Sequence, residues 1–280
     1  MKNITNFKIK NVKLAFVILI VVLFVIFLIY YKFILLTSAQ KNIFTNQMIE
    51  IADENENSVF NIQKILLYSN ATATDNSSDQ SLSDISISQY SDISIYIDNT
   101  SYITDITNEN TVKQLYIDDI IINSNSDKGS KILNYKNPLN FGKYINVEKP
   151  ANNRIDFNII NTNSENEEHD YTLPTFYTDC SNPISLGYLN KDLLTNYSVS
   201  DNVPTLSYNG KVLKEANIDL NDVNYTLTFK IHIINNSNQK FVYNMSLNVK
   251  LDDDNGGIYN GYVYRGKTTT GNEYRFFKEI

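Results

Sequence analysis

Hydrophobic side chains form one unbroken block near the N-terminus and alternate with polar ones in the later part of the chain. Residues 14–31 contain no charged or strongly polar side chain; Lys32 interrupts the block and residues 33–36 resume it. At 1.5 Å per residue, a helix over 14–36 is roughly 34 Å long. That length crosses a hydrocarbon core of about 30 Å. Since the helix has no polar face, the pattern predicts a membrane span rather than a buried helix of a soluble protein.

The charges flanking this block predict its orientation. Lys2, Lys8, Lys10 and Lys13 precede it without any acidic residue, and the chain turns acidic over residues 50–56. The positive-inside rule therefore makes residues 1–13 a cytoplasmic tail and places the bulk of the chain outside the cell membrane. Without the five lysines up to position 32, the chain keeps 19 basic against 31 acidic side chains.

A cleaved signal peptide is the alternative to a retained anchor. Residues 37–39 (Thr-Ser-Ala) are small enough for a cleavage site, so processing after about residue 39 stays open. The apolar part of a signal peptide is usually about 7–15 residues, which is shorter than this block. We therefore expect a single-pass protein that keeps its transmembrane helix.

Residues 37–69 are predicted to form an amphipathic helix that continues from the span. No Gly occurs before position 129 and no Pro before position 138. Apolar residues recur at steps of three and four, which places them on one helix face; they are Phe44, Met48, Ile51, Val59, Ile62 and Leu66. This face would pack on the same chain or on a second copy.

Residues 70–89 are rich in Ser, Asp, Asn and Thr, which predicts a polar linker. From residue 90 onward the period changes to two, which is typical of half-buried strands. The predicted strands are 93–97, 155–159, 225–233 and 241–251, followed by 258–264 and 274–277. Residues 222–280 are predicted to form an antiparallel meander with a turn at 235–240 and another at 254–257. Segment 111–123 fits a helix or a strand.

The predicted fold is therefore mainly β. It consists of an N-terminal transmembrane helix, an extended amphipathic helix and an antiparallel, sandwich-like extracytoplasmic domain over residues 90–280. The polar segment near 195–205 fits a boundary between two β subdomains, and it fits equally well a connection between two sheets of one sandwich.

Composition excludes some classes of function. A net charge of −7 argues against nucleic acid as a partner, because such binding needs a basic surface. One Cys excludes a disulfide within the chain, and two His make a zinc site of His and Cys ligands improbable. The 41 Asn, with many Ile, Tyr and Lys, are typical of an AT-rich genome and suggest a low-GC bacterium. At that Asn content, N-x-S/T triplets occur by chance, and the abundant Tyr need not indicate a sugar-binding surface.

One segment, residues 261–268, matches the P-loop pattern G-x-x-x-x-G-K-T. A P-loop needs a buried strand before it and a helix after it, whose N-terminus faces the phosphates. Here the middle residues are bulky strand formers, and the chain ends a dozen residues later. We therefore expect a strand rather than a nucleotide site.

Two further motifs are incomplete. Residues 200–202 (Ser-Asp-Asn), Ser237 with Lys240, and 267–268 (Lys-Thr) match fragments of serine penicillin-binding enzymes, but in the wrong order along the chain. Residues 252–257 contain three Asp and two Gly, yet the twelfth position of an EF-hand loop starting at 252 or 253 is Val263 or Tyr264 instead of Glu. A solvated turn is expected there, with an irregular calcium site as the alternative.

The remaining candidates are isolated titratable residues. His169 lies in an acidic run, His232 lies on the polar face of a predicted strand, and Cys180 has only His169 nearby in sequence as a catalytic partner. An unpaired thiol, or a disulfide between two chains, fits Cys180 better. The pair Asp118 and Asp119 is interpreted as surface decoration. We assign no catalytic, cofactor-binding or metal-binding residue.

These features predict a membrane-anchored surface or envelope protein that acts by binding or assembly, either with an envelope partner or with itself. A membrane helix that continues into an amphipathic helix and then a β-sheet resembles type IV pilins in outline, which makes a pilin-like or secretion-system subunit the first alternative. The chain lacks the Gly before the apolar block and the early Glu within it, since its first Gly is Gly129 and its first Glu is Glu50. An envelope enzyme with dispersed catalytic residues is the second alternative, because sheets carry such residues on separate loops.

Overall fold

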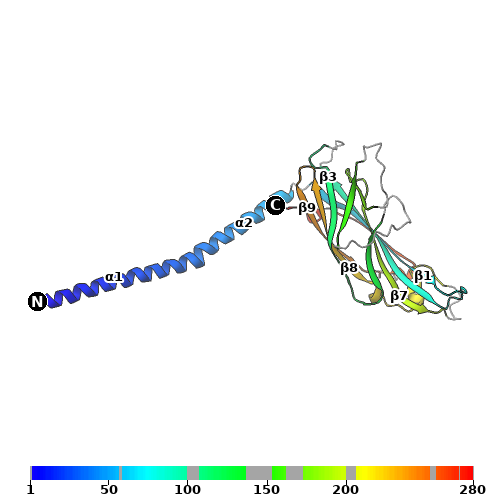
Figure 1. The fold of residues 1–280 in the computed structure, drawn as a ribbon, viewed down its shortest axis with the longest axis horizontal. Coiled ribbons are helices and arrows are strands. Elements are labelled where there is room, and N and C mark those ends of the chain that lie inside the picture. Colours follow the sequence, from blue (N-terminus) through cyan, green and yellow to red (C-terminus); the bar gives the residue numbers. More distant parts are fainter. Residues whose placement is uncertain are drawn as a thin grey trace. The chain divides into compact units, whose positions relative to one another are not determined.

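The computed structural model describes residues 2–56, 59–99, 107–136, 153–161, 173–199, 206–252, 257–270 and 272–279. The chain divides into two compact units, Met1–Glu54 and Asn55–Ile280. Figure 1 shows that the first unit is helical and the second is built from strands.

The N-terminal unit is a nearly continuous helix. It consists of α1 (Lys2–Tyr30), one π-helical turn (Tyr31–Leu35) and α2 (Leu36–Glu56). The stretch Val12–Tyr30 is long and apolar enough to cross a membrane, a property that a signal sequence at an N-terminus shares. Its described apolar side chains are exposed, as expected for a membrane-spanning helix that is apolar all round.

The predicted helix over 37–69 is wrong in its second part, because α2 ends at Glu56 and strand β1 (Phe60–Asp75) follows. A β-bulge interrupts the alternation of this strand, and Leu66, which the predicted helix face included, does not join Ile62 in the core. The pairing of β1 with its neighbour shifts between Ile62 and Lys64, so that Ile62 and Ile65 both contribute to the core. The bulge thus gives the apolar residues of a strand a spacing of three, which is also the spacing on a helix face.

The predicted linker over 70–89 is also wrong. Its two ends belong to β1 and to strand β2 (Ile85–Asn99). The two strands pair along their whole length, with Asp75 opposite Ile85 at one end and Phe60 opposite Asn99 at the other. Only the short connection between the two strands is a turn. Many of the polar residues that suggested a linker lie in this turn, and in the two strands polar residues alternate with the buried Ala71, Ile85 and Ile87.

The strands of the second unit form two sheets. The first has the order β10-β1-β2-β7-β4 and is antiparallel, and the second has the order β11-β9-β8-β3-β5-β6 with β5 and β6 parallel. The bounds not yet given are β3 (Val112–Ser124), β4 (Ser130–Tyr135), β5 (Ile155–Ile160), β6 (Thr175–Tyr177), β7 (Ile184–Tyr197), β8 (Tyr225–Asn235), β9 (Lys240–Val249), β10 (Val263–Thr268) and β11 (Phe277–Glu279). Short helices α3 (Lys211–Glu215) and α4 (Leu220–Val223) precede β8.

The two sheets pack face to face around one hydrophobic core. Three aromatic pairs connect them. Phe60 of β1 meets Phe241 of β9 with ring centroids 5.1 Å apart. Tyr188 of β7 stacks on Tyr225 of β8 at 3.7 Å. Tyr135 of β4 meets Phe157 of β5 at 5.7 Å. Strands from one sheet therefore face strands of the other in the same spatial order, as in a β-sandwich.

Several predicted strands are confirmed. Residues 93–97 lie in β2, 155–159 in β5 and 225–233 in β8, and β8 pairs with β9 around the expected turn. The ambiguous segment 111–123 is a strand. The predicted turn at 254–257 lies outside the described residues apart from Gly257, where a short 3₁₀ helix (Gly257–Asn260) begins.

The predicted C-terminal meander stops at β9. Strand β10 begins at Val263 and pairs with β1 in the first sheet, and Tyr274 lies in a short 3₁₀ helix (Asn272–Tyr274) instead of a strand. Strand β11 then returns to pair with β9. Alternation shows which side of a strand is buried, but it does not identify the partner strand, so the crossing from one sheet to the other was missed.

Phe60→Ala tests whether residue 60 belongs to the core. Phe60 is fully buried against Phe241 and Phe276. We expect the substitution to lower the free energy of unfolding by about 3–5 kcal/mol, the usual cost of removing a buried aromatic ring. Urea unfolding of the full-length chain in detergent, followed by tyrosine fluorescence, measures it. Lys64→Ala, at an exposed position of the same strand, is the control and should change stability by under about 0.5 kcal/mol. If both substitutions changed stability by equally small amounts, the placement of Phe60 in the core would be contradicted.

Candidate binding site at the α4 end of the sandwich

The segment with the P-loop pattern does not form a phosphate-binding loop. Residues 263–268 are strand β10, which pairs with β1; Val263 lies opposite Ser69 and Thr268 lies opposite Lys64. An extended, paired backbone cannot curl around a phosphate. The next element is the three-residue 3₁₀ helix at Asn272, which is too short to supply a helix terminus.

The other motif residues are scattered. Ser237 lies in the β8–β9 turn, where its backbone N–H donates to the carbonyl of Glu109, and Lys240 opens β9. Residues 200–202, His169 and residues 253–256 lie outside the described residues. Among the residues that the structure does describe, no group of three or more His, Cys, Asp or Glu side chains is arranged to hold a metal ion.

The structure does bring His232 and Asp118 together on the outer face of the second sheet. His232 Nε2 lies 2.9 Å from Asp118 Oδ1, and the imidazole stacks on the Tyr116 ring at 4.5 Å. The guanidinium of Arg154 covers the same ring, 3.6 Å from its centroid. Partial burial is the main cause that raises the pKa of the Tyr116 phenol, and the charge of Arg154 opposes it.

This cluster is suited to holding strands together rather than to catalysis. The other imidazole nitrogen, His232 Nδ1, lies 3.9 Å from Glu279 Oε1 of β11, so carboxylates face both nitrogens. A general base needs one nitrogen directed at the proton that it removes. Asp119 points elsewhere and pairs with Lys230 at 2.7 Å. The interpretation of Asp118 and Asp119 as decoration missed the contact across strands, since register cannot be derived from either residue alone.

Cys180 is buried in the core and is a free thiol. Burial, together with the charges of Asp179 and Asp98, raises the pKa of the thiol to about 12. The reactive form of a cysteine is the thiolate, so this environment suppresses nucleophilic chemistry. It also keeps the sulfur away from a second chain.

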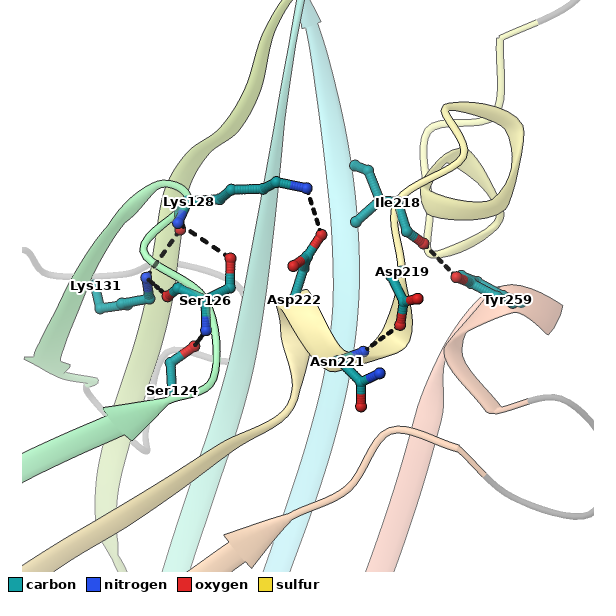
Figure 2. A network of polar contacts seen from close by, with 9 residues as sticks. All are labelled: Ser124, Ser126, Lys128, Lys131, Ile218, Asp219, Asn221, Asp222 and Tyr259. Carbon is teal, nitrogen blue, oxygen red and sulfur yellow. Dashed lines mark hydrogen bonds and ion pairs between the residues drawn. The ribbon is translucent and has the colours of Figure 1, made fainter.

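A different part of the molecule concentrates polar groups that are open to a ligand. Helix α4 lies at one end of the sandwich, between the connection from β3 to β4 and the end of β9 (Figure 2). The carboxylate of Asp219 caps the helix by accepting a hydrogen bond from the backbone N–H of Asn221 at 2.8 Å. Such a cap explains why a helix of one turn forms here.

Polar contacts fasten the β3–β4 connection to α4. Lys128 Nζ lies 2.6 Å from Asp222 Oδ2, and Lys131 Nζ donates to the backbone carbonyls of Ser126 and Lys128 at 2.5 and 2.9 Å. On the other side of α4, the hydroxyl of Tyr259 donates to the carbonyl of Ile218. The connection also needs Gly129 (φ +73°), because a Cβ there would lie 2.2 Å from Asn190 Oδ1.

An open pocket of about 490 Å³ lies beside α4. The part of the pocket on the outer face of the second sheet is one row of residues across three strands. Asn123 of β3 is the register partner of Thr226 of β8, and Thr226 is the register partner of Asn248 of β9. The residues that line the whole pocket are Asn123, Ser124, Asn125, Asn221, Asn224, Tyr225, Thr226, Asn248, Lys250 and Asp252.

Amide side chains dominate this pocket, and most are unused. Asn224 accepts a hydrogen bond from the Leu251 backbone N–H at 2.8 Å and so fixes the wall. The side-chain amides of Asn123, Asn125, Asn221 and Asn248 are exposed and make no hydrogen bond within the described part of the chain. Each offers two N–H donors and a carbonyl acceptor to a ligand.

The interior behind α4 is polar as well. Gln89 and Asn190 are register partners on β2 and β7, and so are Ser91 and Tyr188; all four are buried. The amide N and O of Asn190, Gln89 Oε1, and the hydroxyls of Tyr188 and Tyr225 find no partner among the described residues. Burial strongly raises the pKa of both phenols, so they stay neutral. An unpaired buried polar group costs about 1–3 kcal/mol, so this cluster weakens the core locally.

Gln89 links this interior to α4. Its Nε2 donates to the backbone carbonyl of Val223 at 2.9 Å, in a fully buried position. The pocket wall that α4 provides is therefore held from inside by Gln89 and from outside by the Lys128–Asp222 pair. The sequence does not reveal this site, because its lining comes from three separate segments and because Asn is abundant along the whole chain.

No protein family, curated protein or solved structure matches this chain.

Gln89→Met tests the internal support of α4. The substitution keeps the side-chain length and removes the donor to Val223, so we expect faster amide hydrogen exchange over 218–225 and a stability loss of about 1–3 kcal/mol. Hydrogen–deuterium exchange with mass spectrometry on the full-length chain measures the first. Ser94→Ala, at a solvent-facing position of the same strand, is the control. Unchanged exchange at α4 would show that Gln89 does not hold it.

The raised pKa of Cys180 predicts a loss of stability in alkali. The unfolded thiol ionises near 9 and the folded one near 12, so the folded state keeps a proton that the unfolded state loses. The stability that the buried, protonated thiol contributes is fully present below pH 9 and is lost as the pH rises from 9 to 12. Between pH 8 and 10.5, the free energy of unfolding of the wild type should fall by about 2 kcal/mol more than that of Cys180→Ala. The tyrosines are the same in both proteins and titrate equally, so their effect cancels. Equal losses would contradict the buried thiol.

Proposed function

We propose that the chain is a single-pass, membrane-anchored bacterial envelope protein with a non-enzymatic binding role. In this proposal residues 1–13 lie in the cytoplasm and the β unit lies outside the cell membrane. The apolar helix Val12–Tyr30 supports the anchor, and the four lysines before it support the orientation.

The observation that carries the binding role is the pocket at α4. Four exposed amides converge on it without partners in the described chain. Within that described part, its lining contains one carboxylate, Asp252, and one ammonium group, Lys250. Convergent hydrogen-bonding groups in a concave site are the usual features of ligand recognition. Neither His232 nor Cys180 lines the pocket, so the histidine and the cysteine that the structure describes lie elsewhere.

Self-association through the helical unit is the second candidate, in line with the pilin-like outline. Ile43, Phe44, Met48 and Ile49 of α2 are each more than half exposed in the single chain. Apolar side chains beyond a membrane span favour contact with another helix. In that case α2 would assemble the protein, and the pocket at α4 would serve the assembled form.

Protease treatment of intact cells tests the anchor and its orientation. With a tag at each end, we expect the C-terminal tag to be removed and the N-terminal tag to be protected, because four lysines precede the span. The mass of the untreated protein distinguishes a retained helix from cleavage after residue 39. A control variant with Lys2, Lys8, Lys10 and Lys13 changed to Gln should show mixed orientation. A C-terminal tag protected in intact wild-type cells would overturn the proposal.

A further inference from the structure

We propose that the pocket at α4 binds a neutral carbohydrate, one or two sugar units of an envelope glycan. This inference rests on the proposed binding function and names its ligand class. The pocket, of about 490 Å³, falls within the range of about 300–1,000 Å³ found for small-molecule sites. It is open on one side, so a sugar unit can enter while it remains part of a longer chain.

The charges around the pocket favour a neutral ligand. Lys250 and Asp252 contribute one charge of each sign, and the nearby Lys128 and Asp222 neutralise each other at 2.6 Å. A phosphate or carboxylate ligand would need an excess of Arg or Lys. A bare cation would need several carboxylates, and the lining has one among the residues that the structure describes.

The geometry of the amides matches hydroxyl groups. Asn123 and Asn248 lie in one row of the outer sheet face, with Thr226 between them, while Asn221 approaches from α4. A sugar hydroxyl both donates and accepts, as does each amide. Groups from a sheet and from a helix can therefore contact two edges of one ring.

A peptide fits this pocket less well. Extended peptides bind by adding a strand to an open sheet edge. The pocket lies over a row of residues across β3, β8 and β9, that is, on a face of the second sheet rather than along an edge; β8, in the middle of this row, is paired on both sides. Tyr225 is the one aromatic residue in the lining and its side chain is buried in the core, so side chains of a peptide would find no apolar surface.

The test uses full-length protein in nanodiscs and saturation-transfer NMR. The probes are neutral saccharides (N-acetylglucosamine, its dimer and a galactose disaccharide), with glucuronic acid and an uncharged tripeptide for comparison. We expect transfer to at least one neutral saccharide. Asn221→Ala and Asn248→Ala should each raise its Kd by about two- to tenfold, the factor for one lost neutral hydrogen bond.

Asn244→Ala is the matched control, because Asn244 is also exposed on β9 but lies outside the pocket. Its Kd should equal that of wild type. Thermal unfolding confirms that the three variants fold equally well. An effect of Asn244→Ala as large as that of Asn248→Ala would overturn the assignment of this pocket.

A second control comes from the outer face of the first sheet. Tyr262 and Tyr264 are each 60% exposed there, and Tyr262 lies 5.7 Å from Tyr68, ring to ring. Aromatic rings also attract sugars by stacking. Binding that is lost in Tyr262→Ala and kept in Asn221→Ala would place the carbohydrate on that face and overturn our proposal, as would binding of only the acid or only the tripeptide.

Failure of this inference can be separated from failure of the proposed function. Chemical cross-linking in intact cells captures an envelope component whatever its class. If capture depends on Asn221 and Asn248 but no neutral saccharide binds, the binding function stands and the carbohydrate class is wrong. If no saccharide binds and capture is the same in wild type and the double variant, both are wrong.

Discussion

Burial of the inner faces of two twisted sheets is the constraint on which the β unit depends. Each strand contributes alternate side chains to one shared core, and aromatic pairs connect β1 to β9, β7 to β8 and β4 to β5. These pairs fix how the sheets lie on each other. The ends of the strands are thereby fixed too, and the connections that meet beside α4 are brought to one place. The candidate site follows from the stacking of the sheets rather than from any local motif.

The elements whose pattern is purely local could be predicted from the sequence. The apolar helix, the hairpin of β8 and β9 and the alternation in β2 can each be derived from a single stretch of residues. The failures share one cause. Whether residues 60–75 form a helix or a strand depends on a bulge and on pairing with β2, and the partner of β10 lies nearly 200 residues away. Such information is tertiary, and a pattern of hydrophobic residues does not contain it.

The site was harder to predict than the fold. No residue type in it is unusual for this chain, which has 41 Asn. What distinguishes Asn123, Asn221 and Asn248 is that three elements place them around one pocket with their amides unused. By contrast, the two residues whose side chains are best suited to catalysis make structural contacts. Cys180 is packed in the core, and His232 lies between carboxylates of β3 and β11.

The buried polar cluster has a consequence for how the chain finds its native pairing. In β2 the inward positions at 85, 87, 93, 95 and 97 are all Ile, so sliding β2 by two residues against its neighbours would still bury isoleucine at most of them. Gln89 and Ser91 interrupt that ladder, opposite Asn190 and Tyr188. After such a slide in one direction, Ser91 would face Leu186 and Asn190 would face Ile87. The unpaired groups cost the correct sheet stability, but a shifted sheet would also lose the hydrogen bonds that this register makes, from Gln89 to Val223 and between Ser69 and Ser91. The cluster therefore favours one alignment in an otherwise repetitive strand.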